Sequence, residues 1–139
     1  LLAAPIEDPP ELVALAAGSP GALLAHRQQW QTLPEGLADR LQSLVVGGDA
    51  QRVEGPLTAL ELARDLCEAL EAEQQLWLLD WWQQALWRQH PGPHQAEALR
   101  RLERLRSQLR AYVQPRLSWE VALLELGGFK LGQAEAPSR

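Results

Sequence analysis

The amino-acid sequence predicts an all-α fold: a helical bundle of about five helices, preceded by a shorter helical segment. Leucine and alanine dominate the composition while β-branched residues, tyrosine and phenylalanine are scarce, which favours helix over strand. Apolar residues recur at helical spacing through most of the chain. Prolines and glycines separate these stretches and mark where helices end. At 139 residues, the chain is long enough for one domain with a buried core.

The expected helices follow one another from the first proline-rich residues to a small, polar C-terminal segment. They are expected at residues 11–17, 20–31, 34–46, 56 or 58 to 70, 72–89, 94–113 and 116–126. We expect residues 1–33 to form the smaller element and residues 34–126 the bundle. Residues 127–139 are expected to be a flexible tail, because they are glycine-rich and carry no apolar pattern.

Each break between the expected helices has a local cause. Gly18 stops the first helix, and Ser19 can cap the second by accepting a hydrogen bond from a free amide of its first turn. Pro34 breaks the chain before the third helix. Residues 47–55 form a polar loop that begins Gly-Gly-Asp, and residues 90–93 read His-Pro-Gly-Pro, which no helix crosses.

In the helix that starts near residue 56, one set of apolar residues is expected to face the core. The set is Leu57, Leu60, Ala63, Cys67 and Leu70. Cys67 is interpreted as a small buried hydrophobe. Because it is the only cysteine, no internal disulfide can form, which favours a reducing cytoplasm.

The helix at residues 72–89 is rich in tryptophan and apolar on nearly every side. Its main stripe is Leu78, Leu79, Trp82, Ala85 and Leu86. Trp77 and Trp81 extend this stripe on one flank, and Trp87 lies beyond the other. A helix apolar nearly all round is usually buried on several sides, which predicts a central position in the bundle. Because tryptophan is enriched at interface hot spots, Trp77, Trp81 and Trp87 are also candidate subunit contacts, and at least one should stay partly exposed.

The last two helices are expected to meet at a tight corner. Pro115 ends the helical pattern before it, because it lacks an amide hydrogen, yet it can occupy the first position of the next helix. Leu117, Val121 and Leu124 then mark an apolar stripe. We expect these three side chains to be buried against the tryptophan-rich helix and the arginine-rich helix that precedes the corner.

The sequence of this corner, RAYVQPRLSWEVALLEL, closely resembles the end of the delta-prime subunit of the bacterial DNA polymerase III clamp loader. In that family the sequence pattern is roughly R..L..NVNPRLALE.LLL.L. The matching residues are Arg110, Val113, Pro115, Arg116, Leu117, Glu120, Leu123, Leu124 and Leu126. Tyr112 and Gln114 replace the usual asparagines, and Trp119 stands where a small residue or leucine is common. A γ/τ-type clamp-loader subunit is a close alternative within the same class.

A second segment, Ala16 to Leu24, resembles the A.GSPG.AL sequence that begins the last lid helix of AAA+ clamp-loader subunits. In relatives that use nucleotide, this helix carries an arginine that reaches the ATP phosphates. No arginine lies between Gly18 and His26, which suits delta-prime. The resemblance implies the end of an AAA+ lid, followed by a helical collar that joins other clamp-loader subunits into a ring that loads the sliding clamp onto primed DNA. It implies no cofactor or small-molecule ligand for this part of the subunit.

The charge distribution leaves a function of another class open. The formal net charge is −5, and acidic residues outnumber basic ones up to residue 92, so the chain is not primarily a DNA-coating protein. Arginines are concentrated in the helix at residues 94–113. A small nucleic-acid-binding module could use Arg100, Arg101, Arg104 and Arg110, while Arg106 forms a separate pair with Arg110. The alternative is a face solvated or paired with acidic neighbours, in which Glu97 and Glu103 are close enough to take part.

No pattern in the sequence predicts catalysis or membrane insertion. His26, His90 and His94 are scattered, and no set of Cys, His and carboxylate residues has the spacing of a metal site. The only lysine, Lys130, belongs to no phosphate-binding loop. No apolar run is long enough to cross a bilayer, and no secretory signal pattern opens the chain. We therefore expect a cytoplasmic, non-catalytic piece of a larger protein.

Overall fold

The computed structural model of the chain describes residues 9–44, 56–89, 93–111 and 114–128. In these residues the fold is all-α, with no strand, as the sequence predicted. The helices are α1 (Pro10–Ala16), α2 (Pro20–Gln31), α3 (Leu37–Leu44), α4 (Pro56–Ala69), α5 (Ala72–Gln89), α6 (Pro93–Arg110) and α7 (Pro115–Leu126). The expected tail beyond residue 128 lies outside the described residues.

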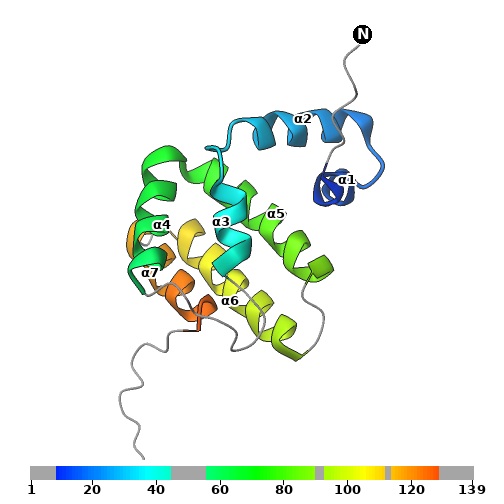
Figure 1. Cartoon of the computed structure of the whole chain (residues 1–139). Helices are drawn as coiled ribbons and strands as arrows, with labels where there is room; N and C mark the ends of the chain where they lie inside the picture. Colours follow the sequence, from blue (N-terminus) through cyan, green and yellow to red (C-terminus); the bar gives the residue numbers. More distant parts are fainter. Residues whose placement is uncertain (1–8, 45–55, 90–92, 112–113, 129–139) are drawn as a thin grey trace, which may run out of the picture.

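Helices α3 to α7 form a bundle, and α1 and α2 lie at one side of it (Figure 1). Within the bundle, α4 packs against α7, α7 against α6, and α6 against α5, while α3 contacts both α4 and α5. Helix α1 packs against α2 and α5. The expectation of about five helices between residues 34 and 126 is confirmed. Helix α5 is the bundle helix against which the N-terminal helix α1 packs.

A single cluster of buried side chains fills the interior. Its largest fully buried members are Trp81, Trp82 and Trp119, surrounded mainly by leucines. Leu12 of α1 belongs to the same cluster, so the first helix contributes directly to the core of the bundle. Gln75 is also buried: its amide donates to the Leu70 carbonyl at 3.0 Å, and its Oε1 accepts from the Trp119 indole at 2.9 Å. This side chain therefore ties the α4–α5 connection to α7.

Two predicted helix ends were wrong because the backbone is left-handed there. The third helix begins at Leu37 rather than Pro34, since Gly36 has a φ of 83°, which a right-handed helix excludes. The first helix ends at Ala16, and Ala17 caps it with a φ of 51°. At the corner, α7 begins at Pro115. The expected extensions of α3 to residue 46 and of α6 to residue 113 end outside the described residues.

The predicted inward face of α4 was wrong in part. Leu57 is 68% exposed, and Leu60 and Cys67 are only half-buried, whereas Ala63 and Leu70 are buried as expected. The residues that face the core instead are Ala59, Leu62, Ala63 and Leu66. Two residues correspond to about 200° of rotation on a helix, so burying Ala59 between neighbouring helices turns Leu57 outward. Leucines occur on several sides of α4, and their spacing therefore does not identify the buried side.

A similar correction applies to α7. Leu117 is 52% exposed, contrary to prediction, and Val121 is half-buried, while Leu124 is buried as predicted. The other inward residues are Ser118, Trp119, Ala122 and Leu123. Trp119 is completely buried and lies two positions after Leu117, so the helix rotation that buries the indole points Leu117 to solvent. The neighbours of α7 are α4 and α6, and it reaches α5 through the Trp119–Gln75 hydrogen bond.

Candidate interaction surface

Helix α5 occupies the central position that its composition predicted. It spans the expected residues, and at its start the Glu71 amide donates to the Gln74 side chain at 2.9 Å, which satisfies one of the free amides of the first turn. Both Leu78 and Leu79 are fully buried, and so is Trp82. Since α1, α3 and α6 all pack against this helix, the burial of several of its sides is explained.

The side chains of Trp77 and Trp81, two of the three candidate contact residues, are buried. Trp77 is 8% exposed, and its indole Nε1 donates to Nδ1 of His26 at 2.9 Å. Trp81 is 1% exposed, and its ring lies against Trp30 with the ring centroids 5.3 Å apart and the planes tilted by 46°. His26 and Trp30 both belong to α2. In the chain as described, neither Trp77 nor Trp81 has a free surface with which to contact a partner.

Trp87, the third candidate, is different because it is 62% exposed. It lies in the last turn of α5, where its carbonyl accepts a hydrogen bond from the Gln95 side chain of α6 at 3.0 Å. The backbone is thereby fixed while the indole faces solvent. The expectation that at least one of the three tryptophans stays partly exposed is confirmed at Trp87, and its contact with another subunit remains a prediction.

The arginines of α6 divide into two groups. Arg100, Arg104 and Arg110 are exposed, whereas Arg101 and Arg106 are each 7% exposed. Arg101 forms an ion pair with Glu125 of α7. Burial lowers the pKa of Arg101, and the negative charge of Glu125 opposes that shift. One of the four arginines proposed for nucleic-acid binding is therefore committed to packing α6 against α7.

Arg106 joins α6 to α5 through several acceptors. Its guanidinium donates to Asp80 at 2.8 Å and to Gln83 at 2.9 Å, both on α5, and also to Glu103 on its own helix. The expectation that Glu103 could pair with an arginine of this helix is confirmed. The sequence did not predict Asp80 or Gln83 as partners, because they lie 26 and 23 positions from Arg106, on the preceding helix.

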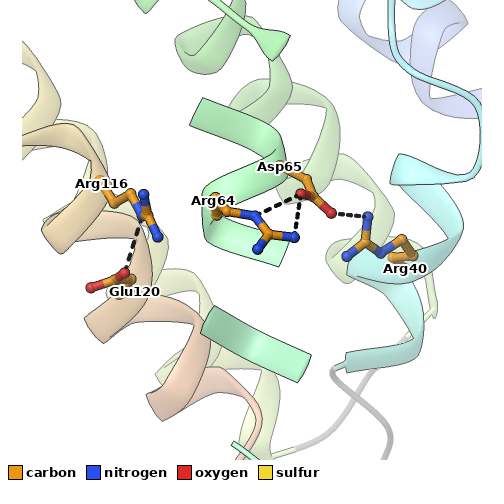
Figure 2. A network of polar contacts seen from close by, with 5 residues as sticks. All are labelled: Arg40, Arg64, Asp65, Arg116 and Glu120. Atoms are coloured by element: carbon orange, nitrogen blue, oxygen red, sulfur yellow. Dashed lines mark hydrogen bonds and ion pairs between the residues drawn. The ribbon is translucent and has the colours of Figure 1, made fainter. Parts of the chain in front are cut away.

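Carboxylates also form pairs with several arginines elsewhere on the bundle surface. Asp65 on α4 accepts from Arg40 of α3 and from its neighbour Arg64, each at 3.1 Å, and Arg116 donates to Glu120 within α7 at 3.3 Å (Figure 2). The hydrogen bond from Arg40, followed by that from Arg64, lowers the pKa of Asp65. These ion pairs reduce the positive electrostatic potential that this part of the bundle surface could offer to the phosphate groups of a nucleic acid.

The described residues include no obvious reactive centre. Within them, no group of three or more His, Cys, Asp or Glu side chains could hold a metal ion. Burial raises the pKa of the Cys67 thiol from 9.0 to about 11, with Arg116 opposing the shift, so the thiol is a poor nucleophile. His90 and the side chain of His94 lie outside the described residues. No helix within the described ranges is long and apolar enough to cross a membrane.

One pocket adjoins the Trp30–Trp81 contact. It has a volume of about 380 Å³, and its walls come from the start of α1, from Trp30 of α2, from α3 and from the second half of α5. Glu11 and Arg88 both line it. The pocket shows that α1, α2, α3 and α5 are not fully packed against one another where they converge.

Comparison with known protein families gives a match. A family model described as cyanobacterial DNA polymerase III delta prime, C-terminal domain, matches residues 3–126. Searches among curated proteins and among solved structures found no match. The matched range covers nearly the whole chain and includes every described helix.

Proposed function

Because the chain belongs to the family of cyanobacterial DNA polymerase III delta prime C-terminal domains, we propose that it is the assembly domain of a clamp-loader subunit. In this proposal residues 1–33 are the end of an AAA+ lid, and residues 34–126 are the helical collar that binds other clamp-loader subunits. The collar helps hold the ring that loads the sliding clamp onto primed DNA. It works in the cytoplasm and catalyses no reaction itself.

The observation that carries this proposal is the exposed indole of Trp87 at the end of a helix whose other tryptophans are buried. A tryptophan buries 150–250 Å² when it is covered, and it is among the residues most often found at interface hot spots. The Gln95 side chain fixes the backbone at Trp87, so the indole is presented from a rigid helix end. A rigid aromatic anchor loses little conformational entropy when a partner covers it.

The family match also bears on the alternatives. It favours a delta-prime collar over the γ/τ type. A separate nucleic-acid-binding module would need the exposed side chains of Arg100, Arg104 and Arg110, since Arg101 is buried against Glu125. Three exposed arginines in an acidic chain predict weak binding that depends strongly on salt.

The test is to mix the chain with the remaining subunits of the same clamp loader and to measure the mass of what forms by size exclusion with light scattering. A complex that contains this chain in place of the full delta-prime subunit is the expected result. The proposal fails if the chain elutes at its own mass of 15.5 kDa beside a complex that lacks it. A parallel titration with duplex DNA at low and high salt tests the nucleic-acid alternative.

A further inference from the structure

Helix α2 differs from the other helices in having no buried residue. Leu23 and Trp30 are only half-buried where they pack against the core, and Leu24 is 51% exposed. Most of its packing is against α1. The bulk of its apolar surface therefore contributes little to holding it on the bundle.

Among the described residues, a hydrogen bond and a ring contact connect α2 to α5, one helical turn apart on each helix. His26 accepts the hydrogen bond from the Trp77 indole at 2.9 Å, and Trp30 lies against Trp81 at 5.3 Å between ring centroids. The pocket of about 380 Å³ adjoins the second contact, so the packing there is incomplete. The indole N–H of Trp81 finds no acceptor among the described residues, which leaves a buried donor unsatisfied in the docked arrangement.

A glycine with a left-handed backbone conformation lies in the connection at each end of α2. Gly18 has a φ of 85° between α1 and α2, and Gly36 has a φ of 83° between α2 and α3. A Cβ added at either glycine would meet nothing within 4 Å, so the space beside each of these two residues is open. Rotation at these two points would move α2 away from α5 and break its packing against α1, while Leu12 keeps α1 in the core.

From these observations we propose that α2 is a strap that lifts off Trp77 and Trp81 while α3–α7 stay folded. In the closed state the strap covers both tryptophans, and in the open state it releases the Trp77 indole N–H and the face of Trp81 that Trp30 covers. The sequence pointed to these same two residues as candidate subunit contacts. Their use by a partner subunit rests on the proposed assembly function, whereas the opening of the strap does not.

Native-state hydrogen exchange on the 139-residue chain tests the opening directly. The amides of α2 and the indole N–H of Trp77 should exchange through a local opening. That exchange should be faster than for the amides of α4, α5 and α7, and should depend little on added denaturant. The indoles of Trp82 and Trp119, which are fully buried, should exchange with the core. Exchange of α2 only in step with α5, at every denaturant concentration, would overturn the proposal.

Variants of His26 show whether the hydrogen bond holds the strap closed. His26→Leu removes the acceptor and should speed exchange of α2 about tenfold, the factor that corresponds to about 1.4 kcal/mol, a typical upper value for one such bond. His26→Asn offers an oxygen near the position of Nδ1 and should restore most of the protection. Gln28→Leu, at an exposed position of the same helix, is the matched control and should leave the rates unchanged.

Two results with these variants contradict the strap. One is equal acceleration of α2, α5 and α7 in His26→Leu, which would make α2 an ordinary part of the bundle. The other is that His26→Asn behaves like His26→Leu, which would mean that the acceptor does not hold the helix. Because the chain is measured alone, either failure leaves the assembly proposal standing, and a failure to assemble leaves the strap standing.

Discussion

Helices α5 and α2, which are joined by the contact between Trp81 and Trp30, pack against the hydrophobic core in different ways. α5 is surrounded by α1, α3 and α6, and three of its four tryptophans are buried. α2 lies at the edge, buries no residue, and reaches α5 mainly through His26 and Trp30. Tryptophan content is therefore not what makes a helix part of the core. The number of neighbouring helices decides how much of each indole is removed from water.

The difference also separates two kinds of stability within one chain. We expect the residues of α4, α5 and α7 with no exposed surface to unfold only when the whole bundle unfolds. The described side-chain contacts between α2 and α5 are a hydrogen bond and an aromatic pair, each typically about 0.5–1.5 kcal/mol. The sum is small compared with a folding free energy of about 5–15 kcal/mol, so we expect two separable levels of opening.

The largest effect is expected from truncating a tryptophan in the bundle. Trp119→Ala should lower the free energy of unfolding by about 3–5 kcal/mol, because the indole is completely buried and its loss leaves the Gln75 oxygen without its partner. Trp30→Ala is the matched change on α2 and should cost only about 1–2 kcal/mol, since it removes at most the docking contact. Urea titration followed by circular dichroism measures both. Equal losses would remove the distinction between the two regions.

A smaller effect is expected from the buried guanidinium that joins α5 to α6. Arg106→Met keeps most of the side-chain stem but removes the donors to Asp80, Gln83 and Glu103, and should cost about 1–3 kcal/mol. The two carboxylates stay accessible to water, which limits the penalty. Arg40→Met breaks the exposed pair with Asp65 and should cost less, with an effect that shrinks in high salt. A larger loss in Arg40→Met would contradict this ranking.

The reactivity of the Cys67 thiol probes the folded bundle without any substitution. Its thiol pKa is raised to about 11 in the folded chain, so at pH 8 the thiolate is about a hundredfold rarer than for a thiol at 9.0. Alkylation by iodoacetamide, followed by mass spectrometry, should be slower than in the urea-unfolded chain and should accelerate about tenfold per pH unit towards 11. The unfolded chain loses this proton first, so stability should fall as the pH rises from about 9 to 11. Equal alkylation rates at pH 8 would show that the thiol is not shielded.

Sequence reasoning identified the elements better than their faces. Breaks with a local cause, such as the capped start at Ser19 and the corner at Pro115, were predicted because the signal lies in adjacent residues. The inward faces of α4 and α7 were misassigned at Leu57 and Leu117, because both helices carry apolar residues on more than one side. Only the position of the neighbouring helices settles which side is buried.

The candidate site was predicted in part for a related reason. The surplus of tryptophan on α5 indicated that at least one of the three candidates would stay partly exposed, and in the structure this is Trp87. The contact of Trp77 with His26 joins residues 51 positions apart, and no local pattern reports such a pair. The same holds for Arg101 and Glu125, whose pairing removed one arginine from the expected basic face.

The most direct test of the account is the affinity of the chain for the other clamp-loader subunits when Trp87 is changed to glutamate. Trp87→Glu should weaken assembly at least tenfold while the melting temperature stays nearly unchanged, because the indole is exposed in the isolated chain. Leu57→Glu, at an exposed apolar position on α4, is the matched control and should bind as the wild type does. Undiminished assembly by a folded Trp87→Glu chain would contradict the assignment of this surface as the subunit contact.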